Sequence, residues 1–249
     1  MAPILFCGRA RLAGPVQQAH FDSPSGPARV ALAAQMVRSV AAAAGWVAPF
    51  RVGLAWAGAP AADGMGTVAA RYGPAIPDLV VRLSALLPLS NAPCLHSDAR
   101  AALEGAASVH QFASAYALIS GSGLGEAYFE NGSSWTREHF QSRLGRACDF
   151  EYQGQDGESW LRAEAWRNQP PEPALAAMRA LVQSRFEQVQ PEVVALGGHF
   201  REWFMRGWIS AELSQRWWSR PTLYLEPELA LLGCVQMEHR RLTATAGLF

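Results

Sequence analysis

The chain has 249 residues, of which 50% are apolar and 17% are charged, and its formal net charge is zero. This composition supplies enough apolar side chains for a sizeable core and does not favour disorder. A neutral chain has no overall field that attracts nucleic acid or an anionic membrane surface, so neither is expected as a partner. All 21 basic residues are arginine, which excludes any mechanism that needs a lysine on a phosphate or in a Schiff base.

The cysteines and the start of the chain indicate an unexported protein. Cys7, Cys94, Cys148 and Cys234 form no Cys-x-x-Cys pair and no His/Cys cluster at zinc spacing, which is typical of reduced thiols. The first apolar run is too short for a secretion signal. Arg38 interrupts the most apolar stretch, so no membrane span is expected. We predict a cytoplasmic protein without zinc or another metal of its own.

Hydrophobic periodicity predicts alternating strands and helices in the first part of the chain. The expected elements are short strands at 3–7 and about 16–21, separated by a turn at 12–15, a helix at about 27–44, a strand at 51–57, a helix at 77–88, a strand at 92–96 and a helix at 99–109.

The pattern then restarts. The expected elements are a strand at 115–120, a glycine loop at 121–125, a strand at 126–130, helices near 158–167 and 173–189, a strand at 192–196, a helix at 199–218, a strand at 222–225 and a helix at 227–238. Such a series predicts an α/β protein of mixed sheets flanked by helices, in two lobes with a cleft between them. We place the N-terminal lobe at 1–112 and the C-terminal lobe at 113–249, and leave open whether the last helix packs back on the first lobe.

A glycine-rich loop joins two of the expected strands and includes Ser120, Gly121, Ser122, Gly123 and Gly125. A dinucleotide-binding fingerprint leads from a strand into a helix, so that interpretation is disfavoured. Two interpretations remain. The loop wraps backbone N–H groups around a phosphate, or it is a tight hairpin that needs glycine for its conformation.

Asp98 stands where an expected strand ends and an expected helix begins, which is the usual place for ligand chemistry in α/β sheets. Its carboxylate can act as a general base that deprotonates a hydroxyl. A plain helix N-cap is the competing interpretation.

Gly197 and Gly198 occupy a similar place after the strand at 192–196. They allow either close approach of a nucleotide to the backbone or a tight structural turn. The polar stretch from 137 to 160 includes Glu138 and His139, which suit a sugar site but equally suit a solvated loop. Tryptophans on the expected helix 199–218 favour a core or an interface, because no basic stripe accompanies them. These tryptophans are residues 203, 208, 217 and 218.

In this order the motifs resemble those of the ROK sugar kinases, a group of the actin-like ATPase (RNase H-like) superfamily. The segment from Leu95 to Glu104 is similar to the family's strand-Asn-Asp-Ala-x-Ala-Ala segment. Residues 119–125, with Asn131 and Gly132 after them, look like its Gly-Thr-Gly-Ile-Gly phosphate loop and the Asn-Gly hairpin. The remaining matches are 51–60 with its Gly-x-x-x-x-Gly-x-Pro strand, 191–198 with its double-glycine strand and 228–233 with its terminal helix. The resemblance covers most of the chain from about residue 28. The N-acetylglucosamine kinase and BadF-like branch shares the glycine loop and the aspartate, and is the second choice.

The resemblance implies a two-lobed carbohydrate kinase that uses ATP and Mg²⁺ to phosphorylate a hydroxyl of a sugar or related polyol. Asp98 would be the catalytic base, and Ser97 stands where the family's sugar-binding asparagine is expected. The loop 120–125 would hold the donor phosphates, with Gly197 and Gly198 near the adenosine. Glu138 and His139 are the further substrate-binding candidates, and the resemblance makes a homodimer plausible.

Departures from the family pattern support a different function. Family members begin with a strand that carries Asp-x-Gly-Gly-Thr, whereas residues 6–11 of this chain read Phe-Cys-Gly-Arg-Ala-Arg. Either the chain begins at what would be the second strand, or Arg9 and Arg11 stand in a replaced loop. The family's Glu-x-Gly-His motif and cysteine-rich zinc site are also not recognisable. The alternative is therefore an inactive relative that binds a small ligand or a partner protein.

Overall fold

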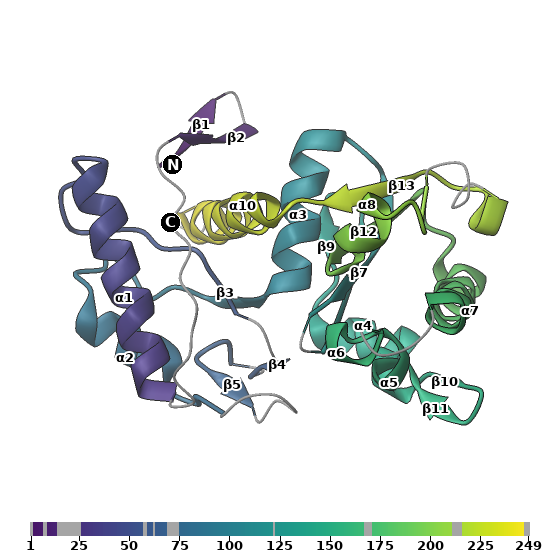
Figure 1. Ribbon diagram of the computed structural model, residues 1–249. Helices are drawn as coiled ribbons and strands as arrows, with labels where there is room; N and C mark the ends of the chain where they lie inside the picture. Colours follow the sequence, from purple (N-terminus) through teal and green to yellow (C-terminus); the bar gives the residue numbers. More distant parts are fainter. Residues whose placement is uncertain are drawn as a thin grey trace. The chain divides into compact units, whose positions relative to one another are not determined.

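The computed structural model describes residues 2–6, 9–13, 26–56, 59–61, 63–68, 75–121, 123–166, 171–210 and 216–246. The chain divides into two compact units, one formed by Met1–Ala101 with Leu231–Phe249 and the other by Ala102–Ala230. The division falls within helix α3 (Asp98–His110), whose first residue is the candidate base Asp98. Figure 1 labels this helix. In the part of the chain described, no helix is long and apolar enough to cross a membrane.

The N-terminal hairpin consists of β1 (Ala2–Phe6) and β2 (Arg9–Ala13), which pair antiparallel. The strand expected at 3–7 is therefore confirmed to within one residue. The turn expected at 12–15 is wrong at its first two positions, because residues 12 and 13 belong to β2. The strand expected at 16–21 lies outside the described residues.

The first unit packs two helices, α1 (Gly26–Ala43) and α2 (Leu79–Leu86), against each other. Val30, Ala34 and Ala41 are buried at helical spacing on α1, as the sequence pattern predicts. This unit also contains the parallel pair β3 (Leu54–Trp56) and β6 (Leu95–Ser97), the short pair β4 (Ala59–Pro60) and β5 (Thr67–Val68), and most of the C-terminal helix α10 (Pro227–Ala246).

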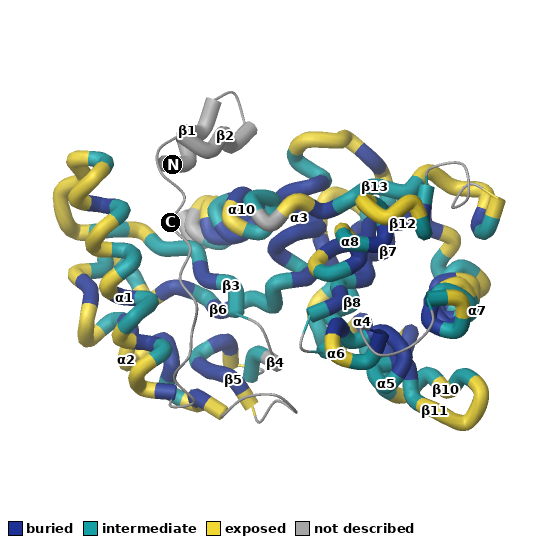
Figure 2. Tube along the Cα trace, viewed as in Figure 1, coloured by how far each residue is buried: buried dark blue, intermediate teal, exposed yellow. Residues whose placement is uncertain are grey.

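The second unit is built on a five-stranded sheet of order β13-β12-β7-β8-β9. Its strands are β7 (Ser114–Ser120), β8 (Leu124–Glu130), β9 (Ser133–Ser134), β12 (Val193–Gly198) and β13 (Thr222–Leu225). The strands β13, β12 and β7 run parallel, whereas β8 and β9 are antiparallel to their neighbours. This is the mixed sheet that the sequence predicts. Figure 2 shows the central strands β7 and β12 largely buried, as strands covered on both faces are.

Several helices and a second hairpin complete this unit. They are α4 (Arg137–Leu144), α5 (Gly157–Leu161), α6 (Ala163–Trp166), α7 (Pro171–Val189), α8 (Phe200–Met205), the short 3₁₀ helix η1 (Ala147–Asp149) and the hairpin of β10 (Glu151–Tyr152) with β11 (Gln155–Asp156). Their apolar side chains form one core with β7 and β12, in which Tyr116, Met178 and Trp203 are fully buried.

The helix expected at 199–218 is wrong in its length. Helix α8 ends at Met205 because Gly207 adopts a left-handed conformation with φ of 71°, and the amide of Trp208 then bonds back to the carbonyl of Trp203 at 2.8 Å. This is a glycine-terminated helix end. The tryptophans nevertheless join the core as expected, since Trp203 and Trp218 are buried members of it and Trp208 and Trp217 pack against it.

Candidate functional site

The glycine loop closes a β-hairpin, as the sequence indicates. Strands β7 and β8 pair up to Ser120 opposite Leu124, and the amide of Gly121 donates to the carbonyl of Gly123 at 2.8 Å. A Cβ added at Gly121 would meet no atom nearer than 3.8 Å, so the loop backbone is open on that side. Ser122 lies outside the described residues.

The base of this loop is tied to the segment around α5 and α6. The hydroxyl of Ser120 donates to the carbonyl of Leu161 at 2.7 Å, and the amide of Ala163 donates to the carbonyl of Gly121 at 2.9 Å. Ser120 is fully buried. Its only hydroxyl proton therefore holds the loop in place, and Ser120 as a cofactor-binding residue remains a prediction. At the other end, the amide of Leu124 faces the carboxylate of Glu158 at 3.4 Å.

The double glycine lies directly beside the loop. Gly197 and Gly198 pair in parallel with Ile119 and Ser120, and the amide of His199 donates to the carbonyl of Ser120 at 2.8 Å. The loop and the double glycine thus meet at the carboxyl ends of β7 and β12, where α/β sheets bind ligands.

Gly198 is required by this packing. Its φ is 65°, and a Cβ there would lie 2.1 Å from the carbonyl oxygen of Ser120, which no side chain tolerates. The tight-turn interpretation of Gly198 therefore holds whether or not a ligand binds. The neighbouring His199 is the N-cap residue of α8, and its Nδ1 lies 3.6 Å from the carboxylate of Glu202.

Asp98 is the first residue of α3, but it is not the cap of that helix. The hydroxyl of Ser97 accepts the amide of Arg100 at 3.3 Å, which is the bond of an N-cap residue to the third helical position. The carboxylate of Asp98 accepts the amide of the next residue, Ala99, at 2.9 Å. Ser97 therefore performs the capping that was the competing explanation for Asp98.

The surroundings of Asp98 suit a base. Desolvation by the protein raises the pKa of this half-buried carboxyl above its usual range, and its bonds to backbone amides oppose that shift only in part. The Asp98 charge also acts on Cys234 of α10, where burial first and this charge second raise the pKa of the thiol to about 12. A carboxylate whose charged form is disfavoured by its surroundings is a stronger base than a carboxylate in water.

Glu138 and His139 are not gathered with the glycine loop. Both are exposed on α4, where the hydroxyl of Thr136 caps the helix by accepting the amide of His139 at 3.2 Å. Helix α4 follows β9, which pairs with residues 129 and 130 at the end of β8 opposite to the glycine loop. The structure thus favours the solvated-surface interpretation of these two residues.

Among the described residues, no group of three or more His, Cys, Asp and Glu side chains is arranged to hold a metal ion. Mg²⁺ usually keeps several waters and binds through one or two carboxylates together with substrate phosphates. A nucleotide-borne Mg²⁺ therefore needs no cage built by the protein alone.

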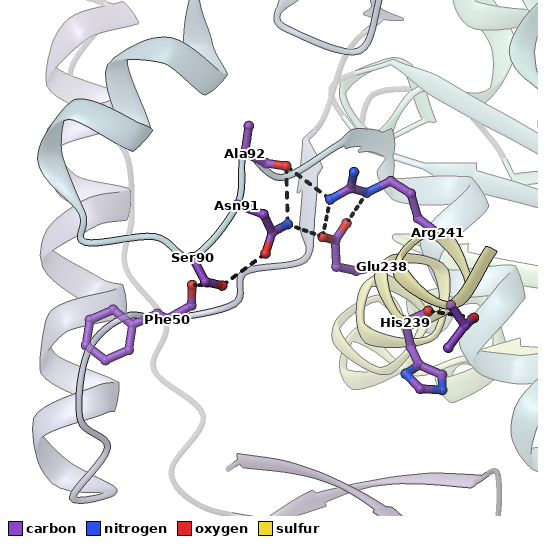
Figure 3. A network of polar contacts seen from close by, with 8 residues as sticks. Phe50, Ser90, Asn91, Ala92, Glu238, His239 and Arg241 are labelled. Carbon is purple, nitrogen blue, oxygen red and sulfur yellow. Dashed lines mark hydrogen bonds and ion pairs between the residues drawn. The ribbon is translucent and has the colours of Figure 1, made fainter. Parts of the chain in front are cut away.

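Sequence reasoning missed the polar network that supports the segment leading to Asp98. Figure 3 shows Glu238 and Arg241 of α10 bonded to Asn91 and to the carbonyl of Ala92. The signal available in the sequence was weak, because a Glu and an Arg three positions apart occur on many exposed helices.

Comparisons with known proteins place the fold. No protein-family model matches the chain, and no curated protein matches it. Solved structures do. An inorganic polyphosphate/ATP-glucomannokinase from Arthrobacter sp. strain KM matches with a TM-score of 0.66 and 17% identity over 88% of this chain and 85% of that one.

Two further solved structures matter for function. A ROK family glucokinase from Streptomyces griseus, in complex with glucose and AMPPNP, matches with a TM-score of 0.52 and 15% identity over 88% of this chain and 89% of that one. A ROK family transcriptional regulator, a homolog of the E. coli MLC protein, matches with a TM-score of 0.56 and 12% identity over 84% of this chain and 68% of that one.

The chain therefore has the actin-like ATPase fold, with mixed sheets flanked by helices. Within that class its fold is that of the ROK proteins, and its structural neighbours include glucokinases and a hexokinase.

Proposed function

We propose that this protein is a sugar kinase that transfers the terminal phosphoryl group of ATP to a hydroxyl of a sugar or related polyol. Asp98 accepts the proton of the attacking hydroxyl, and the loop 120–125 holds the donor phosphates. The single observation that carries the proposal is the half-buried carboxylate of Asp98, whose pKa is raised by desolvation. This carboxylate is not needed as a helix cap, because Ser97 caps α3.

The fold likeness supports this reaction class. A neighbour in complex with glucose and AMPPNP, an ATP analogue, is a ROK family glucokinase. In this chain the open space around Gly121 leaves room for a phosphate at the loop backbone, next to the closely packed Gly197 and Gly198. Mg²⁺ would be held mainly by the phosphates and would neutralise their charge.

Asp98 belongs to the first compact unit and the glycine loop to the second. The boundary expected at 112 and the homodimer remain predictions. Size-exclusion chromatography with light scattering tests the latter.

A coupled assay for ADP release, run with ATP, Mg²⁺ and a panel of hexoses, amino sugars and polyols, tests the reaction. We expect turnover with at least one acceptor, and a fall of about 10²–10⁴-fold in kcat for Asp98→Asn with little change in nucleotide affinity. Asp78→Asn is the matched control, because Asp78 is exposed and paired with Arg82. Equal turnover of wild type and Asp98→Asn would show that the base is wrongly assigned.

The second candidate is an inactive relative that binds a small ligand or a partner protein. The observation behind it is that a neighbour of the same fold is a ROK family transcriptional regulator. Sugar-dependent thermal stabilisation without nucleotide binding at millimolar ATP would favour this function over the kinase.

A further inference from the structure

One face of the C-terminal helix α10 contacts the beginning of the segment that carries Asp98 and the residue before the strand that pairs with it. Cys234, Glu238 and Arg241 follow one another at spacings of four and three residues, so their side chains share that face. All the contacts described below lie within the first unit.

The contacts at the beginning of the segment centre on Glu238. Its Oε1 accepts a bond from Nδ2 of Asn91 at 2.8 Å and forms an ion pair with Nη2 of Arg241 at 2.6 Å, and its Oε2 accepts from Nε of Arg241 at 3.0 Å. Nη2 of Arg241 also donates to the carbonyl of Ala92 at 3.1 Å (Figure 3). The Glu238 side chain is only 5% exposed, so its charge depends on these partners.

The segment from Asn91 to Asp98 includes only a short strand. Strand β6 is three residues long and belongs to a two-stranded sheet with β3. The amide of Leu95 also donates to the carbonyl of Gly64 at 3.2 Å. A short strand in so small a sheet shifts more easily than a strand in the centre of a large sheet when a neighbouring support is removed.

A second contact of this face joins α10 to the partner strand of β6. The carbonyl oxygen of Cys234 lies 2.6 Å from where a Cβ at Gly53 would be placed, so α10 touches the residue before β3 with no room for a side chain. Because β3 pairs with β6, this contact supports the strand that leads to Asp98.

We propose that this face of α10 positions Asp98, with Glu238 as the positioning residue that fixes the beginning of the segment. The role of Asp98 as the base rests on the proposed function. The positioning itself does not, because it is a property of the protein without substrate.

The first test measures the pKa of Asp98 directly. Aspartate side chains are labelled with ¹³C, the Asp98 signal is assigned by its loss in Asp98→Asn, and its titration is compared in wild type and Glu238→Gln. We expect the pKa of Asp98 in Glu238→Gln to fall toward the ordinary range, because loosening the segment exposes the carboxylate to water. His239→Gln is the control, since His239 is exposed on the same helix beside Glu238, and its Asp98 titration should match the wild type.

Removing a negative charge from Glu238 would itself lower the pKa of Asp98, so a variant that keeps the Glu238 charge is also needed. Asn91→Ala deletes the amide that binds Glu238 and leaves the Glu238–Arg241 pair in place. This variant also serves if Glu238→Gln does not fold. The same direction of shift is expected in Asn91→Ala. An unchanged Asp98 titration in this folded variant overturns the positioning proposal.

Kinetics separate this inference from the proposed function. If the protein is a kinase, Glu238→Gln should lower kcat about 10- to 100-fold while the KM for ATP stays within about twofold, since a small displacement of a reacting group has effects of that size. A kcat equal to that of the wild type contradicts positioning for catalysis. If the wild type transfers no phosphoryl group, the kinase proposal fails, and the Asp98 titration still decides whether α10 positions the carboxylate.

Discussion

The carbonyl oxygen of Ser120 lies 2.1 Å from the point where a side chain at Gly198 would begin. This approach joins the glycine loop to the double glycine. From the sequence alone, each glycine could serve either the fold or a ligand. The structure shows that packing requires Gly198, whereas Gly121 has open space around it.

Gly198→Ala is therefore expected to destabilise the protein. Gly207→Ala is the matched control, since its φ of 71° is nearly the same but nothing lies within 4 Å of its added Cβ. In the control, the strain of a left-handed alanine should lower the free energy of unfolding by about 1–2 kcal/mol. In Gly198→Ala the clash should lower it by a further ~1–3 kcal/mol. Urea unfolding measures both, and equal losses would contradict the close approach.

Gly121→Ala tests the ligand side of the same loop. Because a Cβ there meets nothing nearer than 3.8 Å, we expect an unfolding midpoint close to that of the wild type. If phosphates bind against the loop backbone, the added methyl group should weaken ATP binding severalfold, which isothermal titration measures. Unchanged ATP affinity in this variant would place the phosphates elsewhere.

Asp98→Asn should make the fold more stable at neutral pH. The folded-state pKa of Asp98 is raised, so its protonated form is favoured by folding, and that stabilisation is lost as the pH rises through the folded pKa. A neutral asparagine avoids the loss. We expect a higher Tm than wild type at pH 7 and a difference that shrinks below the ordinary carboxyl pKa of about 3.9. A Tm at pH 7 equal to or below that of the wild type would show that burial does not disfavour the charge.

The buried pair of Arg185 and Glu126 supports the strand that follows the glycine loop. Nε of Arg185 lies 2.9 Å from Oε1 of Glu126, both side chains are 5% exposed, and Tyr116 donates to the same oxygen at 2.8 Å. Arg185→Leu should cost about 3–5 kcal/mol because it leaves a buried carboxylate unpaired.

Two comparisons check that explanation. The double variant Arg185→Leu with Glu126→Leu should recover most of the loss, because it removes both charges. Arg82→Leu breaks an exposed pair with Asp78 and should hardly move the denaturation midpoint. If the double variant is as unstable as Arg185→Leu, altered packing and not the unpaired charge causes the loss of stability.

Local patterns were enough to predict much of the fold. The stripe of Val30, Ala34 and Ala41 defines α1, and the apolar run before Ser120 with glycines after it defines the β7–β8 hairpin. Periodicity reports these elements because each buries one face or both. It failed at 199–218, where helical spacing continued past a glycine that ends the helix.

The candidate site was predicted less completely. The positions of Asp98 and the double glycine at strand ends could be read from the chain, since strand and helix patterns meet there. Sequence could not decide between Ser97 and Asp98 as the cap, because both residue types cap helices well. Which of the two residues caps α3 depends on where β6 ends, because that end determines which side chain can reach the amide of Arg100.

By itself the amino-acid sequence determined the order of strands and helices, the neutral lysine-free surface chemistry and the residues that resemble a kinase site. Only the tertiary structure decided that the Ser120 hydroxyl is committed to Leu161, that Glu138 and His139 lie away from the loop, and that α10 supports the Asp98 segment. The physical reason is that these relations join residues far apart in the chain. Burial and hydrogen bonding between such residues arise only once the elements have packed.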